Sequence, residues 1–438
     1  MKPDEVESSP ILRAIGLLLC LHFFFTFSSW NVDLAFGRAA ARFATALPVA
    51  GMQGLSDWVQ AIPSPYIRVV FQALGLASLA AAAGFLQPGG VRRSLQCLVG
   101  LLVCKAVGCA LDLRNLTAHH QLHLAFSAVF LLPGQRLQGL RLALAVASWM
   151  WAGSRLSNSW LGGLSVYSLP SGLPLLPHSL GFIRLFCWLV FLLEVLAPLA
   201  FWSSSLKLRR AALLALLTWN AYFGLLAGLG YAALVVPLAA LLVVEGFQQS
   251  LRHLLPSRPA ITLLALVLLC GLWQLVIPGD VRLSAEGRYL GLLAGDSGWR
   301  TRALLRVAKG RQRWEFRLEW SAVDASLSRA CQVQVLRNGQ LVPAGMQSAR
   351  GRVFFNPGYF STLPSSLHND PYAYLHWANQ VQRRARPDEL SLELWTRLDG
   401  QTEEIQTVKL MDLARQTPSY NSLWRNFWIM LPGEPAAR

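Results

Sequence analysis

The residue with the clearest potential for chemistry is Arg155, which follows a long apolar run that ends at Trp151. An ionisable side chain at the end of an apolar helix is costly unless it reaches water, is paired or is used. Arg155 therefore has two interpretations. It either extends its guanidinium to a membrane surface, or it forms a polar site together with Asn158 and Trp160, which follow it.

Three histidines within five residues, His119, His120 and His123, form a second candidate site. His119 and His123 are four residues apart and share one helical face, the spacing of paired metal ligands. The sequence offers no third ligand, so we expect no metal. A pH-sensitive or substrate-orienting histidine fits better than a metal ligand, and a structural histidine at the interface fits best. The polar residues just before them are Asp112, Arg114 and Asn115.

Three further polar side chains interrupt apolar segments: Lys105, Glu194 and Asn220. A buried charge needs a partner. Asp112 lies about 10 Å along the helix from Lys105 and Arg184 about 15 Å from Glu194, at 1.5 Å rise per residue. We therefore expect other helices to supply the partners, in structural ion pairs.

Two irregular stretches complete the candidate sites. The proline-broken segment 165–178 is either a plain connecting loop or a re-entrant lid, which is tolerated at membrane depth only where protein or a cavity shields it. Phe355-Asn356-Pro357-Gly358-Tyr359 is a turn flanked by aromatic residues, which either belong to a core or line a substrate pocket. The sequence contains no Walker loop, nucleophile elbow, HExxH motif or dinucleotide-binding glycine pattern.

The composition predicts an integral membrane protein: 54% of the residues are hydrophobic and only 14% are charged. The membrane part is expected at 1–278 and a more polar domain at 279–438. Basic loops that face the cytoplasm account for much of the net charge of +16, so a nucleic-acid partner is not expected. Six of the seven cysteines lie in apolar runs, and no disulfide framework or CxxC pair is evident.

The hydropathy pattern predicts about nine membrane helices. Residues 31–66 are expected to form an amphipathic interfacial helix and a loop. The predicted helices are 11–30, 67–87, 93–113, 119–133, 138–156, 179–203, 209–228, 230–246 and 259–277.

The basic loops alternate in a way that predicts the orientation. Arginines and lysines near 92, 136, 207 and 252 all fall on one side, which should be the cytoplasm. The N-terminus then lies in the cytoplasm. The segments 31–66, 114–118 and 157–178 lie outside together with the C-terminal domain, which is periplasmic if the membrane is a bacterial inner membrane.

The region after 279 predicts a β-rich α+β domain. Residues 314–320 and 390–398 alternate apolar and polar side chains, the period of half-buried strands. Asn338-Gly339 is a hairpin turn signal. Between the strands, 371–384 has helical spacing, and Asp370 is placed to cap its first turn. The helix should bury Tyr374, Trp377, Ala378 and Val381.

Several short motifs together resemble the vitamin K-dependent gamma-glutamyl carboxylase family and its bacterial relatives with a horizontally transferred transmembrane domain. Ala152-Gly153 with Leu156 and Trp160 is similar to the family's Ala-Gly-x-(x)-Lys-Leu-x-x-x-Trp stretch, and His119 with Leu122 to its Asn-His-x-Tyr-Leu segment. Phe355–Ser361 is similar to Leu-Asn-Pro-Gly-Val-Phe-Thr. The final strands, Leu392–Gly400 and Lys409–Leu413, follow in the same order.

This resemblance implies a membrane enzyme that deprotonates reduced vitamin K, forms an epoxide with oxygen, and uses the resulting base to carboxylate glutamate. A lysine in the Ala-Gly segment acts as the base toward the hydroquinone. The segment matching Phe355–Ser361 is associated with the substrate glutamate.

Three departures argue against the family reaction in this chain. Arg155 stands where the lysine is expected, and arginine stays protonated at any physiological pH. The family's seventh-helix histidine is absent from Thr218–Phe223, and Ala118 replaces the asparagine before His119. We therefore predict a carboxylase-like membrane protein without the lysine-dependent chemistry. It is expected to keep a periplasm-facing cavity for a lipid or a menaquinone-type quinone, and to bind or mature a partner such as an exported protein or peptide with glutamate.

The alternative prediction is an active quinone-dependent epoxidase or carboxylase-like lyase that uses another base. His119 and His120 are best placed for that role, and Lys105 is a more deeply buried candidate. A small-solute transporter is a weaker possibility, because no inverted repeat or pair of broken helices is evident.

Overall fold

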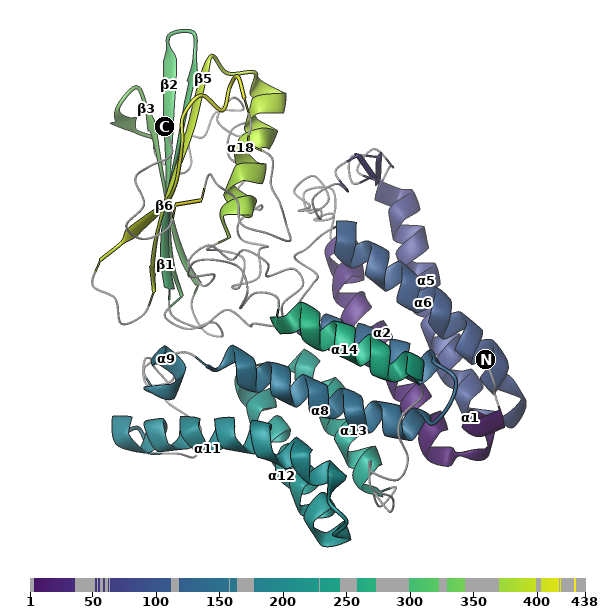
Figure 1. The fold of residues 1–438 in the computed structure, drawn as a ribbon. Helices are drawn as coiled ribbons and strands as arrows, with labels where there is room; N and C mark the ends of the chain where they lie inside the picture. Colours follow the sequence, from purple (N-terminus) through teal and green to yellow (C-terminus); the bar gives the residue numbers. More distant parts are fainter. Residues whose placement is uncertain are drawn as a thin grey trace. The chain divides into compact units, whose positions relative to one another are not determined.

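The computed structural model describes the chain as two compact units (Figure 1). The helical unit comprises Met1–Arg155 and Trp188–Leu272, and the sheet unit comprises Leu156–Cys187 and Trp273–Arg438. The described residues are 4–35, 52, 54–55, 58–59, 62, 64–111, 118–156, 158–163, 177–227, 229–244, 258–272, 299–322, 329–342, 370–398, 403–416, 418 and 429–430.

Each of the nine predicted apolar segments contains a helix within the described residues. A short N-terminal helix that the sequence pattern did not predict precedes them, and α2 continues to Ala35. The helices are α1 (Asp4–Ser8), α2 (Pro10–Ala35), α5 (Ser64–Leu86), α6 (Val91–Leu111), α7 (Ala118–Leu131), α8 (Arg136–Ser154), α9 (Asn158–Leu161), α11 (Leu180–Leu199), α12 (Leu206–Ala227), α13 (Leu229–Val244) and α14 (Arg258–Leu272). Two 3₁₀ turns, η1 (Pro88–Gly90) and η3 (Ala200–Trp202), follow α5 and α11.

Three of these helices are long and apolar enough to cross a membrane, judged by length and composition among the described residues: Pro65–Leu86, Val91–Leu111 and Leu180–Trp202. Several others are short. Helices α7, α13 and α14 have 14, 16 and 15 residues, whereas a bilayer core of about 30 Å takes about 20 helical residues. The described helices therefore support membrane association, and they do not establish nine crossings.

The helical unit is assembled by packing of helices distant in sequence. Helix α2 packs against α5, α6, α7 and α13, and α8 packs against α7 and α14. The turn between α5 and α6 is especially close, because a Cβ on Gly90 would lie 2.4 Å from the carbonyl oxygen of Gly84. Glycine at position 90 thus permits the backbones to meet.

Within the sheet unit, six antiparallel strands have the order β4-β3-β2-β1-β5-β6. Asn338 and Gly339 connect β3 to β4 with φ angles of 50° and 82°, which confirms the predicted hairpin turn. The strands are β1 (Trp299–Lys309), β2 (Gln312–Ala322), β3 (Arg329–Arg337), β4 (Gln340–Leu341), β5 (Glu389–Leu398) and β6 (Ile405–Leu410).

Helix α18 (Pro371–Ala385) lies against the sheet (Figure 1) and confirms the predicted helix. The Asp370 carboxylate accepts a hydrogen bond of 2.9 Å from the Tyr372 backbone N–H, as an N-cap should. The ring of Trp377 meets that of Phe316 edge-on, 6.1 Å between centroids. The predicted apolar face of α18 is buried: Tyr374, Trp377, Ala378 and Val381.

The side chains on the other face of the strands are charged. Arg306 pairs with Glu393 and, at 3.5 Å, with Glu315. Arg302 pairs with Glu404 at 3.1 Å. These groups are largely solvated, so they define a polar surface more than they stabilise the sheet.

Candidate functional site

Arg155 ends helix α8 and turns its side chain into the helical unit. Its backbone N–H donates to the carbonyl oxygens of Trp151 and Ala152 at 3.2 and 3.1 Å, and thereby closes the last helical turn. The residue is only 4% exposed. The guanidinium therefore does not extend into solvent, and it needs a partner inside the protein.

That partner is Glu194 of α11, which forms an ion pair with Arg155. The indole N–H of Trp219 on α12 donates to the same carboxylate oxygen, Oε1, at 2.7 Å. The guanidinium lies 5.7 Å from the ring centroid of Trp151 and 5.3 Å from that of Trp219. Three helices thus hold one buried ion pair between two aromatic rings.

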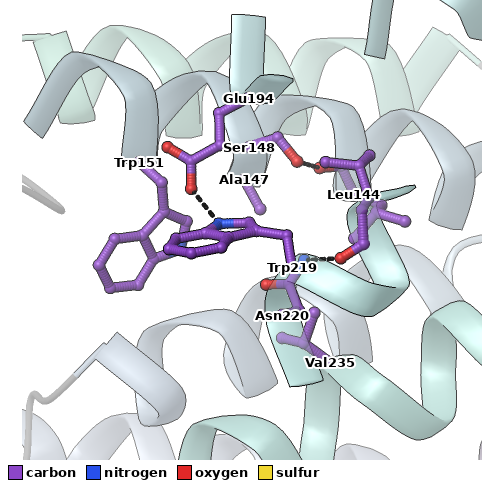
Figure 2. A pocket seen from close by; sticks show the side chains of 9 residues that line it. Leu144, Ala147, Ser148, Trp151, Glu194, Trp219, Asn220 and Val235 are labelled. Atoms are coloured by element: carbon purple, nitrogen blue, oxygen red, sulfur yellow. Dashed lines mark hydrogen bonds between the residues drawn. The ribbon is translucent and has the colours of Figure 1, made fainter. Parts of the chain in front are cut away.

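A small pocket lies beside this ion pair. Its empty space of about 270 Å³ includes open solvent, and the enclosed part has room for about one water molecule. Figure 2 shows the Glu194 carboxylate and the Trp151 and Trp219 rings at the pocket. The lining is mostly apolar, with few polar groups, as is typical of sites for small ligands. Its residues are Leu144, Ala147, Ser148, Trp151, Glu194, Leu216, Trp219, Asn220 and Val235.

The second carboxylate oxygen of Glu194, Oε2, is the polar atom of interest in the pocket. It is buried and has no hydrogen-bond partner among the described residues. Ser148 and Asn220 already donate to carbonyl oxygens of their own helices, at 3.0 Å to Leu144 and 2.7 Å to Leu216. A ligand that donates a hydrogen bond to Oε2 would satisfy a group that is otherwise costly to bury.

The predicted histidines form a separate site, in which α7 meets α2. The ring centroids of His119 and His120 are 4.2 Å apart. His22 of α2 stacks on His123 at 5.0 Å and approaches His119 edge-on at 6.1 Å. The structure therefore joins the predicted histidines to a fourth imidazole.

Lys105 of α6 completes what we call the histidine–lysine cluster: His22, Lys105, His119, His120 and His123. Its Nζ lies 5.8 Å from the ring centroid of Phe23, which in turn is 6.3 Å from the ring of His123. Lys105 lies within electrostatic range of His119, His120 and His123.

One hydrogen bond determines a tautomer in this cluster. His123 Nε2 lies 2.8 Å from the carbonyl oxygen of Leu19. Because a carbonyl only accepts, Nε2 carries the proton, and in the neutral ring Nδ1 is an acceptor. In the part of the chain that the structure describes, no group of three histidine, cysteine or acidic side chains is arranged to hold a metal ion.

The remaining predicted site residues are not brought together in this way. Trp160 is half-buried in α9. Asn158 begins α9, but its side chain lies outside the description. Outside the described residues as well are Asp112, Arg114, Asn115, segment 164–176 and Phe355, Asn356, Pro357, Gly358 and Tyr359.

Sequence reasoning missed His22 as a member of a site, and it did not identify the partner of Glu194. The available signal was an ionisable group inside an apolar run, which applies to His22 as well as to Glu194. This signal does not show which residues pair, because Arg155 and Glu194 lie on different helices, as do His22 and His123.

Comparisons with known proteins add no relative to these observations. No protein-family model, no curated protein and no solved structure matches the chain. The resemblance to the gamma-glutamyl carboxylase family therefore remains a hypothesis that depends on the short motifs alone.

Proposed function

We propose that the helical unit is a carboxylase-like membrane module that binds the head group of a quinone or lipid in the pocket beside Arg155 and Glu194. The single observation that carries this proposal is the buried oxygen Oε2 of Glu194, which has no partner among the described residues and belongs to a side chain that lines the pocket together with Trp151 and Trp219. Flat rings stack on tryptophan, and a hydroxyl on such a ring donates to a carboxylate.

The ion pair argues against lysine-type base chemistry at this position. The Arg155 guanidinium is paired with Glu194, and a guanidinium is a poor general base. The two side chains are therefore better suited to orienting a polar head group than to removing a proton. The module would then serve the binding or maturation of a partner, such as an exported protein or peptide with glutamate.

The proposed setting is a bacterial inner membrane that the chain crosses about nine times. The N-terminus would be cytoplasmic, and the C-terminal domain at 279–438 periplasmic. The three long apolar helices and the basic residues near the ends of α5, α8 and α12 support this arrangement.

Binding can be tested on the full chain in lipid nanodiscs, with menadione and its reduced form titrated calorimetrically. Ala147 lines the pocket, so Ala147→Leu should fill it and weaken binding about tenfold, or roughly 1.4 kcal/mol. Ala83→Leu introduces the same side chain at an exposed site of α5 and should leave binding unchanged. Equal affinity in both variants would place the ligand elsewhere.

A second candidate function is supported by the histidine–lysine cluster. Four imidazoles and an amine in a buried site can move protons, and His119 or His120 would act as the base toward a reduced quinone. Purified protein should then form epoxide from reduced vitamin K analogues and oxygen, and His119→Ala should abolish it. Epoxide from Arg155→Lys alone, with none from the native chain, would instead favour a lost base at position 155.

A further inference from the structure

Within the described part of the helical unit, Lys105 differs from the other buried cations because its Nζ has no hydrogen-bond acceptor. Arg136 Nε donates to the carbonyl oxygen of Phe130 at 2.9 Å, and Arg209 donates to that of Ser203 at 2.7 Å. Lys105 is 0% exposed, and no hydrogen-bond partner of its Nζ exists among the described residues.

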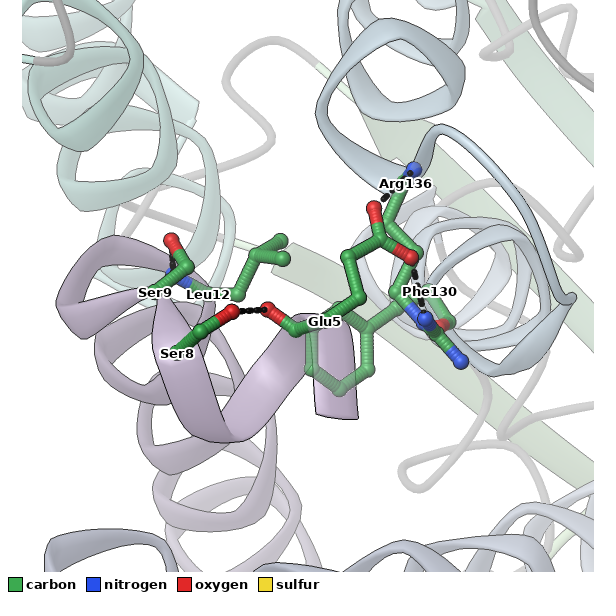
Figure 3. Close-up of polar contacts among 6 residues, drawn as sticks. All are labelled: Glu5, Ser8, Ser9, Leu12, Phe130 and Arg136. Carbon is green, nitrogen blue, oxygen red and sulfur yellow. Dashed lines mark hydrogen bonds and ion pairs between the residues drawn. The ribbon is translucent and has the colours of Figure 1, made fainter. Parts of the chain in front are cut away.

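Lys105 also has no counter-ion among the described residues. Glu5 is paired with Arg136. Its carboxylate accepts one hydrogen bond from the Arg136 backbone N–H at 3.2 Å and one from the Arg136 guanidinium at 2.5 Å (Figure 3). Glu194 is engaged by Arg155. Glu7 is exposed. The side chains that do surround Lys105 are aromatic rings, imidazoles and, one turn along α6, the Cys109 thiol.

These surroundings favour the uncharged amine. An ammonium group without acceptor or carboxylate is strongly disfavoured in an apolar interior, and its contact with the Phe23 ring is a weak compensation. A buried uncharged lysine is a nucleophile that attacks carbonyl carbons. Nearby imidazoles can supply and remove the protons that such a reaction needs.

We propose that Lys105 is a covalent attachment site for a lipophilic aldehyde or ketone. The Nζ lone pair adds to the carbonyl carbon, and the carbonyl π electrons move to oxygen, which takes a proton from His119 or His120. The same imidazole removes a proton from nitrogen. The carbinolamine hydroxyl then takes a proton from this imidazole and leaves as water, and the imidazole recovers the remaining N–H proton as the imine double bond forms between Nζ and carbon. No oxidant or reductant takes part.

The ligand is lipophilic because Lys105 lies in a helix whose outer face is apolar. Val103 and Val107 of α6 are exposed on the helical unit, and α6 is one of the three helices long enough to span a membrane. A long-chain aldehyde dissolved in the bilayer would reach this helix without crossing water. This site uses α2, α6 and α7, and it is independent of the proposed head-group pocket on α8, α11 and α12.

The test is trapping of the imine on the full chain in nanodiscs. Dodecanal is added at neutral pH with sodium cyanoborohydride, and adducts are located by peptide mass spectrometry. The chain has only five lysines, so the map is simple: Lys2, Lys105, Lys207, Lys309 and Lys409. Because the surroundings of Lys105 favour the uncharged, nucleophilic amine, Lys105 should be alkylated at least about tenfold faster than the exposed Lys207.

Three variants complete the experiment. Lys105→Met should remove the rapid adduct, and Lys207→Arg, a change at an exposed site of the same unit, should keep it. His119→Gln should slow adduct formation without changing its final extent. Adducts on Lys207, Lys309 or Lys409 with none on Lys105 in the native chain would overturn the proposal, and this measurement does not depend on the folding of any variant. Menadione binding by Lys105→Met reports separately on the head-group pocket.

Discussion

Arg155 and Glu194 pair with each other because neither side chain is exposed to water. Both residues are almost fully buried, and the Trp219 indole supports the carboxylate. Removing one member of such a pair leaves the other as an uncompensated charge, whereas replacing both by apolar groups is often neutral. The pair is therefore better explained by site geometry than by a large net contribution to stability.

Single and double replacements of the pair should consequently differ in the size of their effect on stability. Arg155→Leu or Glu194→Leu alone is expected to lower the free energy of unfolding by roughly 3–5 kcal/mol. The double variant should lose less than either single variant. Denaturant unfolding of the detergent-solubilised chain measures these differences, with Glu7→Leu as the exposed control. Additive losses in the double variant would contradict a direct pairing.

At the scale of elements, local patterns predicted what local forces determine. Asp370 and the spacing of Tyr374 and Trp377 were enough to predict α18, and Asn338-Gly339 was enough for the β3–β4 hairpin. The nine apolar runs predicted nine helical positions in the described chain. Short helix α1 was missed, since no hydrophobic periodicity marks its five residues.

The close turn between α5 and α6 permits a precise test of element packing. A methyl group on Gly90 would collide with the backbone of Gly84, so Gly90→Ala should destabilise the chain by roughly 1–3 kcal/mol. Gly89→Ala is the matched control, because nothing lies within 4 Å of a Cβ at that position. Thermal unfolding in detergent distinguishes the two. Equal midpoints would show that the helices can separate there without loss.

At the scale of the molecule, the spacing of residues in the sequence could not predict which residues on different helices come into contact. The assignment of Arg155 to a lysine-like position came from a motif, but its contact with Glu194 depends on how α8 and α11 pack. In the same way, His22 joins the α7 histidines only because α2 lies against α7. Packing of helices distant in sequence is set by many side chains together, and periodicity reports only which face is apolar.

Orientation in the membrane is a prediction at this same scale. A reporter that is active only in the periplasm, fused after Arg438, should be active if the proposed topology is correct. A reporter inserted after Gly134, between α7 and α8, serves as the opposite control and should be silent, because that connection is expected in the cytoplasm. Activity only in the second fusion would show the opposite orientation, and activity in neither fusion would contradict a periplasmic C-terminal domain.

The contact between Glu5 and Arg136 joins two parts of the chain that are synthesised at different times. The two residues are 131 positions apart. At about 5–20 residues per second, a ribosome takes on the order of ten seconds to synthesise the intervening chain. The contact between α1 and the start of α8 can therefore form only after α2, α5, α6 and α7 have been synthesised.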